Sequence, residues 1–475
     1  MPDVVKVTLN NETLIDISDS TVEANKVLNG YVGYEGDGDR FVGTASGGGG
    51  TDLTHWQRPS GWPDYSQLDM TNEEAIYLTY KTNEPTSVAM IDVVALSNSS
   101  SITVETGTLT NGVFTARTTE TFTGGFDYFR WFTGYSEDYA VVRISGGVKW
   151  INLNNVTYDD TLYPYHTTQY CVEIYGRLPS GTNNGLTELM LRSNIFCRSL
   201  TLLDMNSLTS LLRVAGDALS LENFYVSGTD PTKNISLYFA FANCRNLRYA
   251  YFNGMHTQSV NNAFKGCYRL RYTDVEDLVV NTTDPLNSVF ESCRELDSLD
   301  LSGWSATCAS ATSAFAYCSG LKSVTLSENI HVNGSMQNGF RESAIESVPA
   351  MDYSGVTNFN YMFYTTNLTG DVDFTDMPVA TIDAWSYNRA VRSITLPDTV
   401  TQINANAFRD CYSLREVHLT GTTVPTLSNV NAFTTNNSSE LKIYVPYSED
   451  HSVLAAYQAA TNWSSLTNLV EEDPS

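Results

Sequence analysis

A short phrase, Phe-x-x-Cys-x-x-Leu, recurs along the C-terminal half of this 475-residue chain and restricts its fold more than any other feature. From Phe241 onward the anchor aromatic residues follow one another every 22 to 26 residues. The complete copies are Phe241-Cys244-Leu247, Phe264-Cys267-Leu270, Phe290-Cys293-Leu296, Phe315-Cys318-Leu321 and Phe408-Cys411-Leu414. The degenerate copies are Phe340-Ser343-Ile345, Phe363-Thr366-Leu368 and Trp385-Asn388-Val391.

This period predicts a coil that turns once per copy. The last Leu of a copy is usually followed by a short strand-like step, such as Val324-Thr325-Leu326. One copy buries too few apolar side chains to offset the entropy lost in ordering it, whereas stacked copies share a core and pair their strands. We therefore predict a solenoid over residues 181–440 and a terminal cap over residues 441–475. Five of the eight cysteines would form one internal column of small buried hydrophobic side chains, without disulfides or metal.

Several segments resemble the BspA-like class of leucine-rich repeats. Residues 403–419 read INANAFRDCYSLREVHL, and Asn262-Ala263-Phe264 and Asn431-Ala432-Phe433 repeat part of that phrase. Residues 441–446 with Tyr457 and Trp463 resemble the terminal cap of the class. The class occurs in bacterial and protist surface proteins and in phage proteins, so the resemblance implies adhesion or recognition and no enzymatic reaction. Ser, Thr and Asn replace Cys between residues 335 and 392, which predicts looser packing there.

Aligning the copies places one outward strand residue of each in a row: Tyr251, Asp274, Asp300, Thr325, Asp352, Asp373, Thr395 and His418. The neighbouring outward row reads Arg248, Arg271, Asp297, Lys322, Glu346, Thr369, Arg392 and Arg415. Acids on consecutive turns repel one another unless a cation or a proton intervenes.

The candidate binding residues of this row are Tyr251, Asp274, Asp300, Asp352, Asp373 and His418. They would contact a glycan or protein receptor, with calcium as an optional bound ion and no other cofactor. The alternative is a solvated sheet face whose acids are balanced by the neighbouring basic row.

Residues 1–45 predict a small β-rich module. Hairpins are expected from residues 5–9 with 13–17 and around Asp37-Gly38, with a short helix between them from about Ser20 to Leu28. The order of these phrases is similar to a module of tail and other structural proteins of phages that infect Gram-positive bacteria. The likeness implies docking to other virion proteins or to further copies of the chain. Asp37-Gly38-Asp39 is similar to the start of a calcium loop but lacks its later acidic ligands, so a plain turn is expected.

Between module and solenoid, the glycine-rich residues 46–55 predict a linker and residues 56–180 an antiparallel β-sandwich. Alternating runs such as residues 75–80 and 139–144 are separated there by Gly, Asn and Ser turns. In the aromatic stretch 126–132, Tyr128 and Trp131 could stack on sugars, or the stretch could belong to the sandwich core. The expected fold class is thus mainly β with short helical segments.

Composition excludes several functions. The net charge is −26, and no basic stripe of the kind that nucleic-acid binders need is visible. Charged residues make up 17% of the chain, so its surface must depend on Ser, Thr, Asn, Gly and Tyr, as adhesive loops do. No apolar run is long enough to span a membrane, and the first residues lack the pattern of a secretory signal. No metal-binding, nucleophile-elbow or phosphate-loop motif points to an enzyme.

These features together predict a phage virion surface protein, of the tail-fibre or receptor-binding type, that adheres to the host through its solenoid. A head or tail decoration protein without receptor contact is the alternative. A bacterial cell-surface adhesin is a further alternative, against which the missing secretory signal counts.

Overall fold

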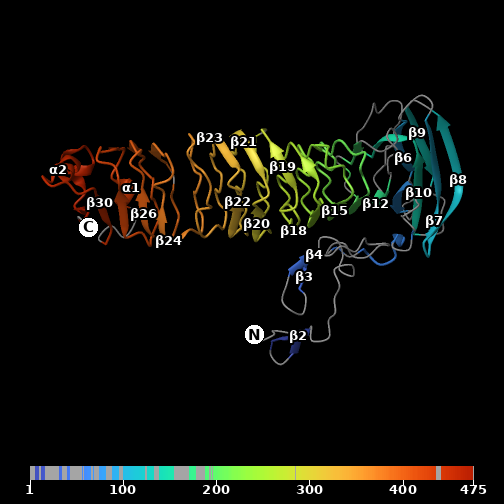
Figure 1. Ribbon diagram of the computed structural model, residues 1–475, viewed down its shortest axis with the longest axis horizontal. Helices are drawn as coiled ribbons and strands as arrows, with labels where there is room; N and C mark the ends of the chain where they lie inside the picture. The colour runs from blue at the N-terminus through green and yellow to red at the C-terminus, as the bar shows by residue number, and fades with distance from the viewer. Residues whose placement is uncertain are drawn as a thin grey trace.

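The protein is described from a computed structural model as a sheet-rich end followed by a long solenoid (Figure 1). The structure describes residues 196–473 apart from Asp284, Ala384 and 435–439, and the earlier residues 6–9, 12–16, 32–34, 40–42, 56, 58–65, 68, 74–81, 88–95, 100–123, 126–132, 138–153, 171–177, 188–191 and 194. The predicted fold class is confirmed, since most described elements are strands and the few helices are short.

Two antiparallel hairpins begin the chain. β1 (Lys6–Leu9) pairs with β2 (Glu12–Asp16), and β3 (Val32–Tyr34) pairs with β4 (Arg40–Val42), as the sequence predicts. The expected helix near residues 20–28, the Asp37-Gly38-Asp39 turn and the 46–50 linker lie outside the described residues.

Two sheets follow the hairpins. One has the order β13 (Glu188–Met190), β11 (Val148–Asn152), β6 (Val88–Ala95) and β9 (Phe126–Phe132). The larger begins with β8 (Val113–Thr123), β7 (Ser101–Thr110), β10 (Tyr139–Gly146), β5 (Ala75–Lys81) and β12 (Cys171–Arg177). These five strands run antiparallel to their neighbours, as expected of the predicted sandwich.

The larger sheet continues without a break into the solenoid, which the sequence does not predict. β12 pairs in parallel with β14 (Ser199–Leu203), and the sheet goes on through β15 (Asn223–Val226), β16 (Tyr249–Tyr251) and β18 (Tyr272–Thr273). An open solenoid end would present unpaired backbone groups, to which another chain could pair. Here β12 covers that edge and joins the two parts of the molecule.

Further along the rod most coils have two short strands and a turn segment. The first-strand sheets contain β20 (Ser298–Leu301) and β22 (Ser323–Leu326), then β24 (Thr369–Asp373), β26 (Ala390–Leu396), β28 (Glu416–Leu419), β30 (Lys442–Val445) and β31 (Leu469–Glu471). The second-strand sheets contain β17 (His256–Thr257), β19 (Val279–Thr282), β21 (Ser305–Ser310) and β23 (Ile330–Ser335), then β25 (Thr381–Ile382), β27 (Gln402–Ile403) and β29 (Thr426–Leu427). The two sets of strands lie along opposite edges of the rod in Figure 1.

The turn segment carries the Phe-x-x-Cys phrase and also bonds to the next coil. Backbone N–H groups of Ser288, Phe290 and Ser292 donate to carbonyl oxygens about 24 residues later, at 2.8–2.9 Å. The residues two positions before and two positions after the anchor Phe290 have positive φ, 52° at Ser288 and 66° at Ser292. This alternation points successive N–H groups toward the neighbouring coil, so all sides of the rod are hydrogen-bonded.

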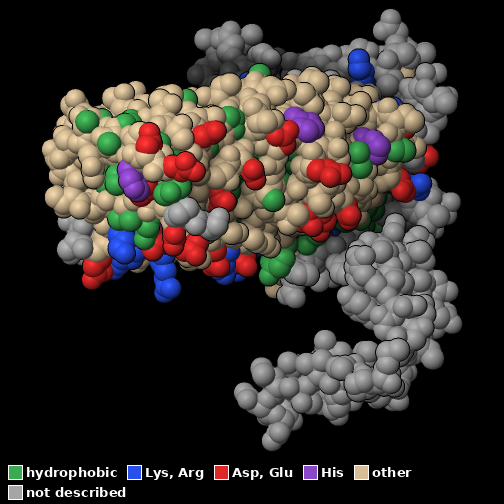
Figure 2. All heavy atoms as spheres, turned by 60° about the vertical axis from the view of Figure 1, so that its left-hand side comes forward, with side chains coloured by type: hydrophobic (Ala, Val, Ile, Leu, Met, Phe, Trp, Pro, Cys, Tyr) green, Lys and Arg blue, Asp and Glu red, His purple; other side chains and the backbone are tan. Residues whose placement is uncertain are grey.

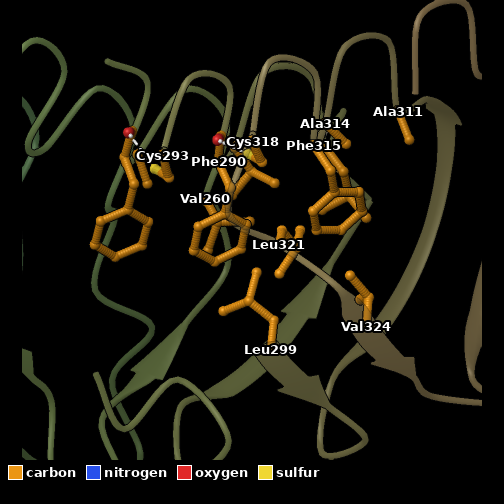
Figure 3. Packing of buried hydrophobic residues seen from close by; sticks show 14 of the residues in the cluster. Val260, Phe290, Cys293, Leu299, Ala311, Ala314, Phe315, Cys318, Leu321 and Val324 are labelled. Atoms are coloured by element: carbon orange, nitrogen blue, oxygen red, sulfur yellow. Dashed lines mark hydrogen bonds between the residues drawn. The ribbon is translucent and has the colours of Figure 1, made fainter. Parts of the chain in front are cut away.

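The anchor aromatic residues stack inside the rod, as predicted (Figure 3). From Phe241 to Phe363 their ring centroids lie 5.0–6.0 Å apart and their planes are within 14°. All eight cysteines are buried and free, which confirms that they form no disulfide.

The copies between residues 335 and 392 use polar side chains instead of the Cys thiol. Ser343, Thr366 and Asn388 are buried there, and each makes a side-chain hydrogen bond. A cavity of about 10 Å³ borders Asn388 and Trp385. Hydrogen bonds thus satisfy the replacement residues, and the looser packing expected there stays a prediction.

The C-terminal end of the rod is closed by short helices. After α1 (Asn431–Thr434), α2 (Ser452–Ala459) and the 3-10 helix η4 (Trp463–Ser465) fold over the last coils. The Trp463 ring lies 5.9 Å from Phe433, and its indole nitrogen donates to the carbonyl of Pro425 at 2.8 Å. The aromatic column thus ends on a buried tryptophan.

Candidate functional site

The predicted outward row follows the first strands over part of the rod. Asp300 pairs with Thr325 between β20 and β22, and Asp373, Thr395 and His418 pair across β24, β26 and β28. Tyr251, which is half-buried, ends β16. Over these coils the spacing from the anchor sets the strand register.

Asp352 lies outside this row, which corrects the predicted alignment. It bridges to His331 of β23 in the second-strand sheet, with its carboxylate 3.5 Å from the imidazole Nδ1. The backbone N–H of Glu346 donates to the carbonyl of Lys322, which places these two residues side by side. Three residues further along each coil, Pro349 therefore takes the position that corresponds to Thr325. Proline has no N–H for a sheet, and this coil forms no first strand among its described residues. Asp352 and Asp373 are therefore not adjacent.

The exposed acids of the predicted set make bonds within their own turns. Asp300, Asp352 and Asp373 each accept the backbone N–H two residues later, at 2.9 Å. Short turns of this kind are a common structural use of aspartate. A binding role for these three residues stays a prediction.

Asp274 joins two coils. Its carboxylate accepts the N–H groups of Phe252 and Asn253, at 2.7 and 2.8 Å. Burial raises the pKa of this carboxyl to about 7, although the two N–H groups oppose the rise. The side chain therefore has a structural role in the solenoid.

His418 links the last strands of the rod. Its Nδ1 lies 2.6 Å from Glu472, its Nε2 lies 3.5 Å from Glu416, and its ring stacks on Tyr444 at 4.6 Å. These contacts tie β28 and β30 to the C-terminal strand. Tyr128 and Trp131 lie on β9, opposite Asp92 and Ala89, but their side chains are outside the described structure.

A groove of about 510 Å³ opens on the second-strand side of the early coils. We call it the uncharged groove; its lining residues are Leu212, Ser236, Tyr238, Gln258, Ser259, Asn281, Thr282 and Thr283. Bridges from Ser210 to Ser236 and from Ser236 to Ser259 align these coils, so that polar side chains of successive turns meet there.

The described residues of this lining are uncharged, although the chain carries a net charge of −26. Amides and hydroxyls provide donors and acceptors, while Tyr238 and the exposed Leu212 provide apolar surface. Ser259 is buried, and its Oγ has no hydrogen-bond partner among the described residues. Buried hydroxyls are nearly always paired, so Ser259 is an exception among the residues beside the groove.

Sequence reasoning missed this groove because it followed the first-strand row. The available signal was weak: Ser236 and Ser259 both lie five residues before an anchor Phe. Figure 2 shows one face of the rod, where backbone and side chains that are neither charged nor hydrophobic cover most of the surface and acids occur singly or in small groups. Lysine and arginine side chains gather along its lower edge.

Within the described parts of the chain, no group of three or more His, Cys, Asp or Glu side chains is placed to hold a metal ion. No helix of these parts combines the length and hydrophobicity that crossing a bilayer requires.

The family assignment comes from the repeats. A family model described as "BspA type Leucine rich repeat region (6 copies)" matches residues 195–296, 233–369 and 381–467, together more than half of the chain. The chain belongs to the BspA-type leucine-rich-repeat family. The resemblance found in residues 403–419 and in the terminal phrases is thereby confirmed, and the match does not include the first 45 residues.

Two solved structures are similar to this BspA-type protein. One is a leucine rich cell surface protein from Faecalibacterium prausnitzii A2-165, with 16% identity over 69% of this chain and 90% of that one, and a TM-score of 0.29. The other is a leucine-rich repeat protein from Bacteroides ovatus ATCC 8483, with 12% identity over 69% and 95% of the two chains, and a TM-score of 0.32. Among curated proteins none matches.

Proposed function

We propose that this BspA-type protein is a surface-displayed adhesion protein that binds a neutral glycan in the uncharged groove. The observation that carries the proposal is a groove of about 510 Å³ whose described lining residues are all uncharged. Ligand sites of this kind combine apolar surface with a few polar groups that fix orientation.

Each part of the groove suits a sugar. The Tyr238 ring offers an apolar face to the C–H groups of a pyranose, while Gln258 and Asn281 are exposed amides that can donate to and accept from hydroxyls. An ionic ligand would find no counter-charge among the described residues of the lining.

For the setting we favour the surface of a bacterial cell. This setting is supported by membership of the BspA-type family, which the repeats alone establish. A virion role, as tail fibre or as head or tail protein, further requires that residues 1–45 act as a particle-docking module. That module stays a prediction, as does any contact with virion proteins or with further copies of the chain. Immunogold labelling of producing cells and of purified particles would distinguish the two settings.

The binding experiment uses the full chain and a panel of neutral hexasaccharides: cello-, malto-, xylo- and chito-oligosaccharides. We expect one of them to bind in calorimetry, and Tyr238→Ala or Gln258→Ala to weaken it by roughly tenfold or more. Tyr412→Ala removes an exposed tyrosine from a distant coil and should leave the affinity unchanged. Failure of every neutral glycan to bind, or full affinity in both groove variants, would reject the proposal.

A further inference from the structure

Five residues on the turn side of the later coils form a second unusual surface, which we call the tyrosine–arginine cluster: Tyr317, Arg341, Tyr361, Tyr364 and Tyr387. The Arg341 guanidinium carbon lies 5.0 Å from the Tyr364 ring centroid, 5.5 Å from Tyr361 and 5.7 Å from Tyr317. Tyr364 also meets Tyr361 and Tyr387 edge to face, at 5.8 and 5.4 Å. All five side chains are half-buried.

Stacking of the coils assembles this cluster. Tyr317 follows the anchor Phe315 by two residues, Arg341 follows Phe340 by one, and Tyr387 follows Trp385 by two. Since the anchors of consecutive coils lie 5.0 and 5.7 Å apart along this part of the rod, residues near them meet on the surface.

Three of the tyrosines occupy backbone positions that disfavour them. φ is 62° at Tyr317, 57° at Tyr361 and 67° at Tyr387, in the left-handed region that bulky side chains avoid. At the position two residues after the anchor, other coils have Asn243, Gly266 or Ser292. Positive φ is a regular feature of these turn positions, also at Phe239 and Glu342, and a bulky tyrosine there costs stability that glycine or asparagine would not.

The arginine at the centre is held in place and still able to bind. Its Nε donates to Glu342 at 3.2 Å, while its two Nη groups make no hydrogen bond within the described structure. Three rings restrict the guanidinium plane, so little freedom is left to lose when a ligand binds. Fixed, paired N–H donors of this kind match the two oxygens of a carboxylate.

We propose that the tyrosine–arginine cluster binds a carboxylate-bearing sugar of an acidic polysaccharide, with Arg341 on the carboxylate and tyrosine rings against the sugar. The inference rests on the proposed adhesion function but concerns a site other than the uncharged groove. A sugar is favoured over an acidic peptide because one planar cation among four aromatic rings suits a ring with a single carboxylate.

The test measures binding of galacturonate, glucuronate and sialic acid oligosaccharides to the full chain by calorimetry, each beside its methyl ester. We expect one acid to bind and its ester to bind roughly tenfold more weakly or worse. Arg341→Gln should cause a similar loss. Arg294→Gln is the matched control, because Arg294 lies 4.6 Å over a single ring, that of Tyr268, and its loss should change nothing.

A second variant separates binding from folding. Tyr361→Asn places at 361 the residue found at the equivalent position 338, where φ is also positive, at 57°. It should weaken acid binding while the unfolding temperature stays the same or rises. Equal binding of acid and ester, no binding of any acid, preference for a glutamate-rich peptide, or a clear fall in unfolding temperature would each overturn the inference. Tyr238→Ala should leave acid binding intact, so failure here and failure of the neutral-glycan groove can be told apart.

Discussion

The thiol of Cys318 donates a hydrogen bond to the carbonyl oxygen of Phe290, 3.0 Å away in the preceding coil. Cys267 bonds to Phe241 and Cys293 to Phe264 in the same way, at 3.1 and 3.2 Å. Burial raises the pKa of Cys318 to about 12, so the thiol keeps its proton and remains a donor. The cysteine column therefore joins coil to coil, in addition to filling the core as predicted.

We predict that Cys318→Ala lowers the free energy of unfolding by about 1–2 kcal/mol, because it removes a hydrogen bond and leaves a small cavity. Cys318→Ser should cost less than Cys318→Ala, since a hydroxyl keeps the donor. Urea unfolding of the two variants measures the difference. If serine were the worse replacement, the column would be apolar filler alone.

Asn388 replaces the thiol with a network of four hydrogen bonds. Its amide nitrogen donates to the carbonyls of Phe363 and Trp385, at 2.9 and 2.8 Å. Its oxygen accepts from the Thr366 hydroxyl and backbone N–H, at 2.6 and 3.1 Å.

We predict that Asn388→Leu destabilises the protein by roughly 3 kcal/mol, because buried partners lose their hydrogen bonds. The double variant Thr366→Cys with Asn388→Cys places the cysteine of the repeat phrase in both coils and should lose under about 1 kcal/mol, since thiols can donate as in the complete copies. The midpoints of urea unfolding compare the two. A double variant as unstable as Asn388→Leu would mean that these coils do not tolerate the consensus residues.

The solenoid could be predicted because the spacing of Phe and Cys reports directly on which side chains face inward. Its outer surface was harder to predict, since the register there depends on backbone pairing. Asp352 lies 12 residues after the anchor Phe340, whereas the other members of the row lie 10 residues after theirs, and Pro349 removes the strand of that coil. The uncharged groove borders β17, a strand of two residues that leaves no alternating pattern in the sequence. The tyrosines at 317, 361 and 387 contradict backbone preference, so only the structure brings them together.

Positive φ at the turn positions makes a further prediction about stability. Ser292 has φ of 66°, where glycine has no Cβ penalty. Ser292→Gly should therefore raise the free energy of unfolding by about 0.5–1 kcal/mol. The matched change, Gly266→Ala, should lower it by about 1–2 kcal/mol. There φ is 75°, and a Cβ would lie 2.8 Å from the Asn243 side-chain oxygen. Thermal unfolding of both variants checks the opposite signs, and a loss in Ser292→Gly would refute the argument.

A buried ion pair near the sheet junction makes the protein sensitive to pH. Glu173 on β12 is fully buried, and one of its carboxylate oxygens accepts from Arg58 Nε and Nη2, at 3.1 and 2.7 Å. Its other oxygen has no hydrogen-bond partner among the described residues. Burial raises the pKa of Glu173 from 4.5 to about 7, although Arg58 opposes the rise.

The sign of the pH effect follows from this shift. Between pH 4.5 and about 7 the unfolded chain releases the Glu173 proton while the folded protein keeps it, so stability falls as pH rises. The loss is on the order of 3 kcal/mol for this group. Asp274, whose pKa is also raised to about 7, adds a loss in the same direction. Glu173→Gln cannot ionise and should flatten the fall over this range, and Asp274→Asn on the same background should flatten it further. Urea midpoints at pH 4.5, 6 and 8 measure the slopes; an unchanged slope in Glu173→Gln would show that the folded carboxyl ionises near its ordinary pKa.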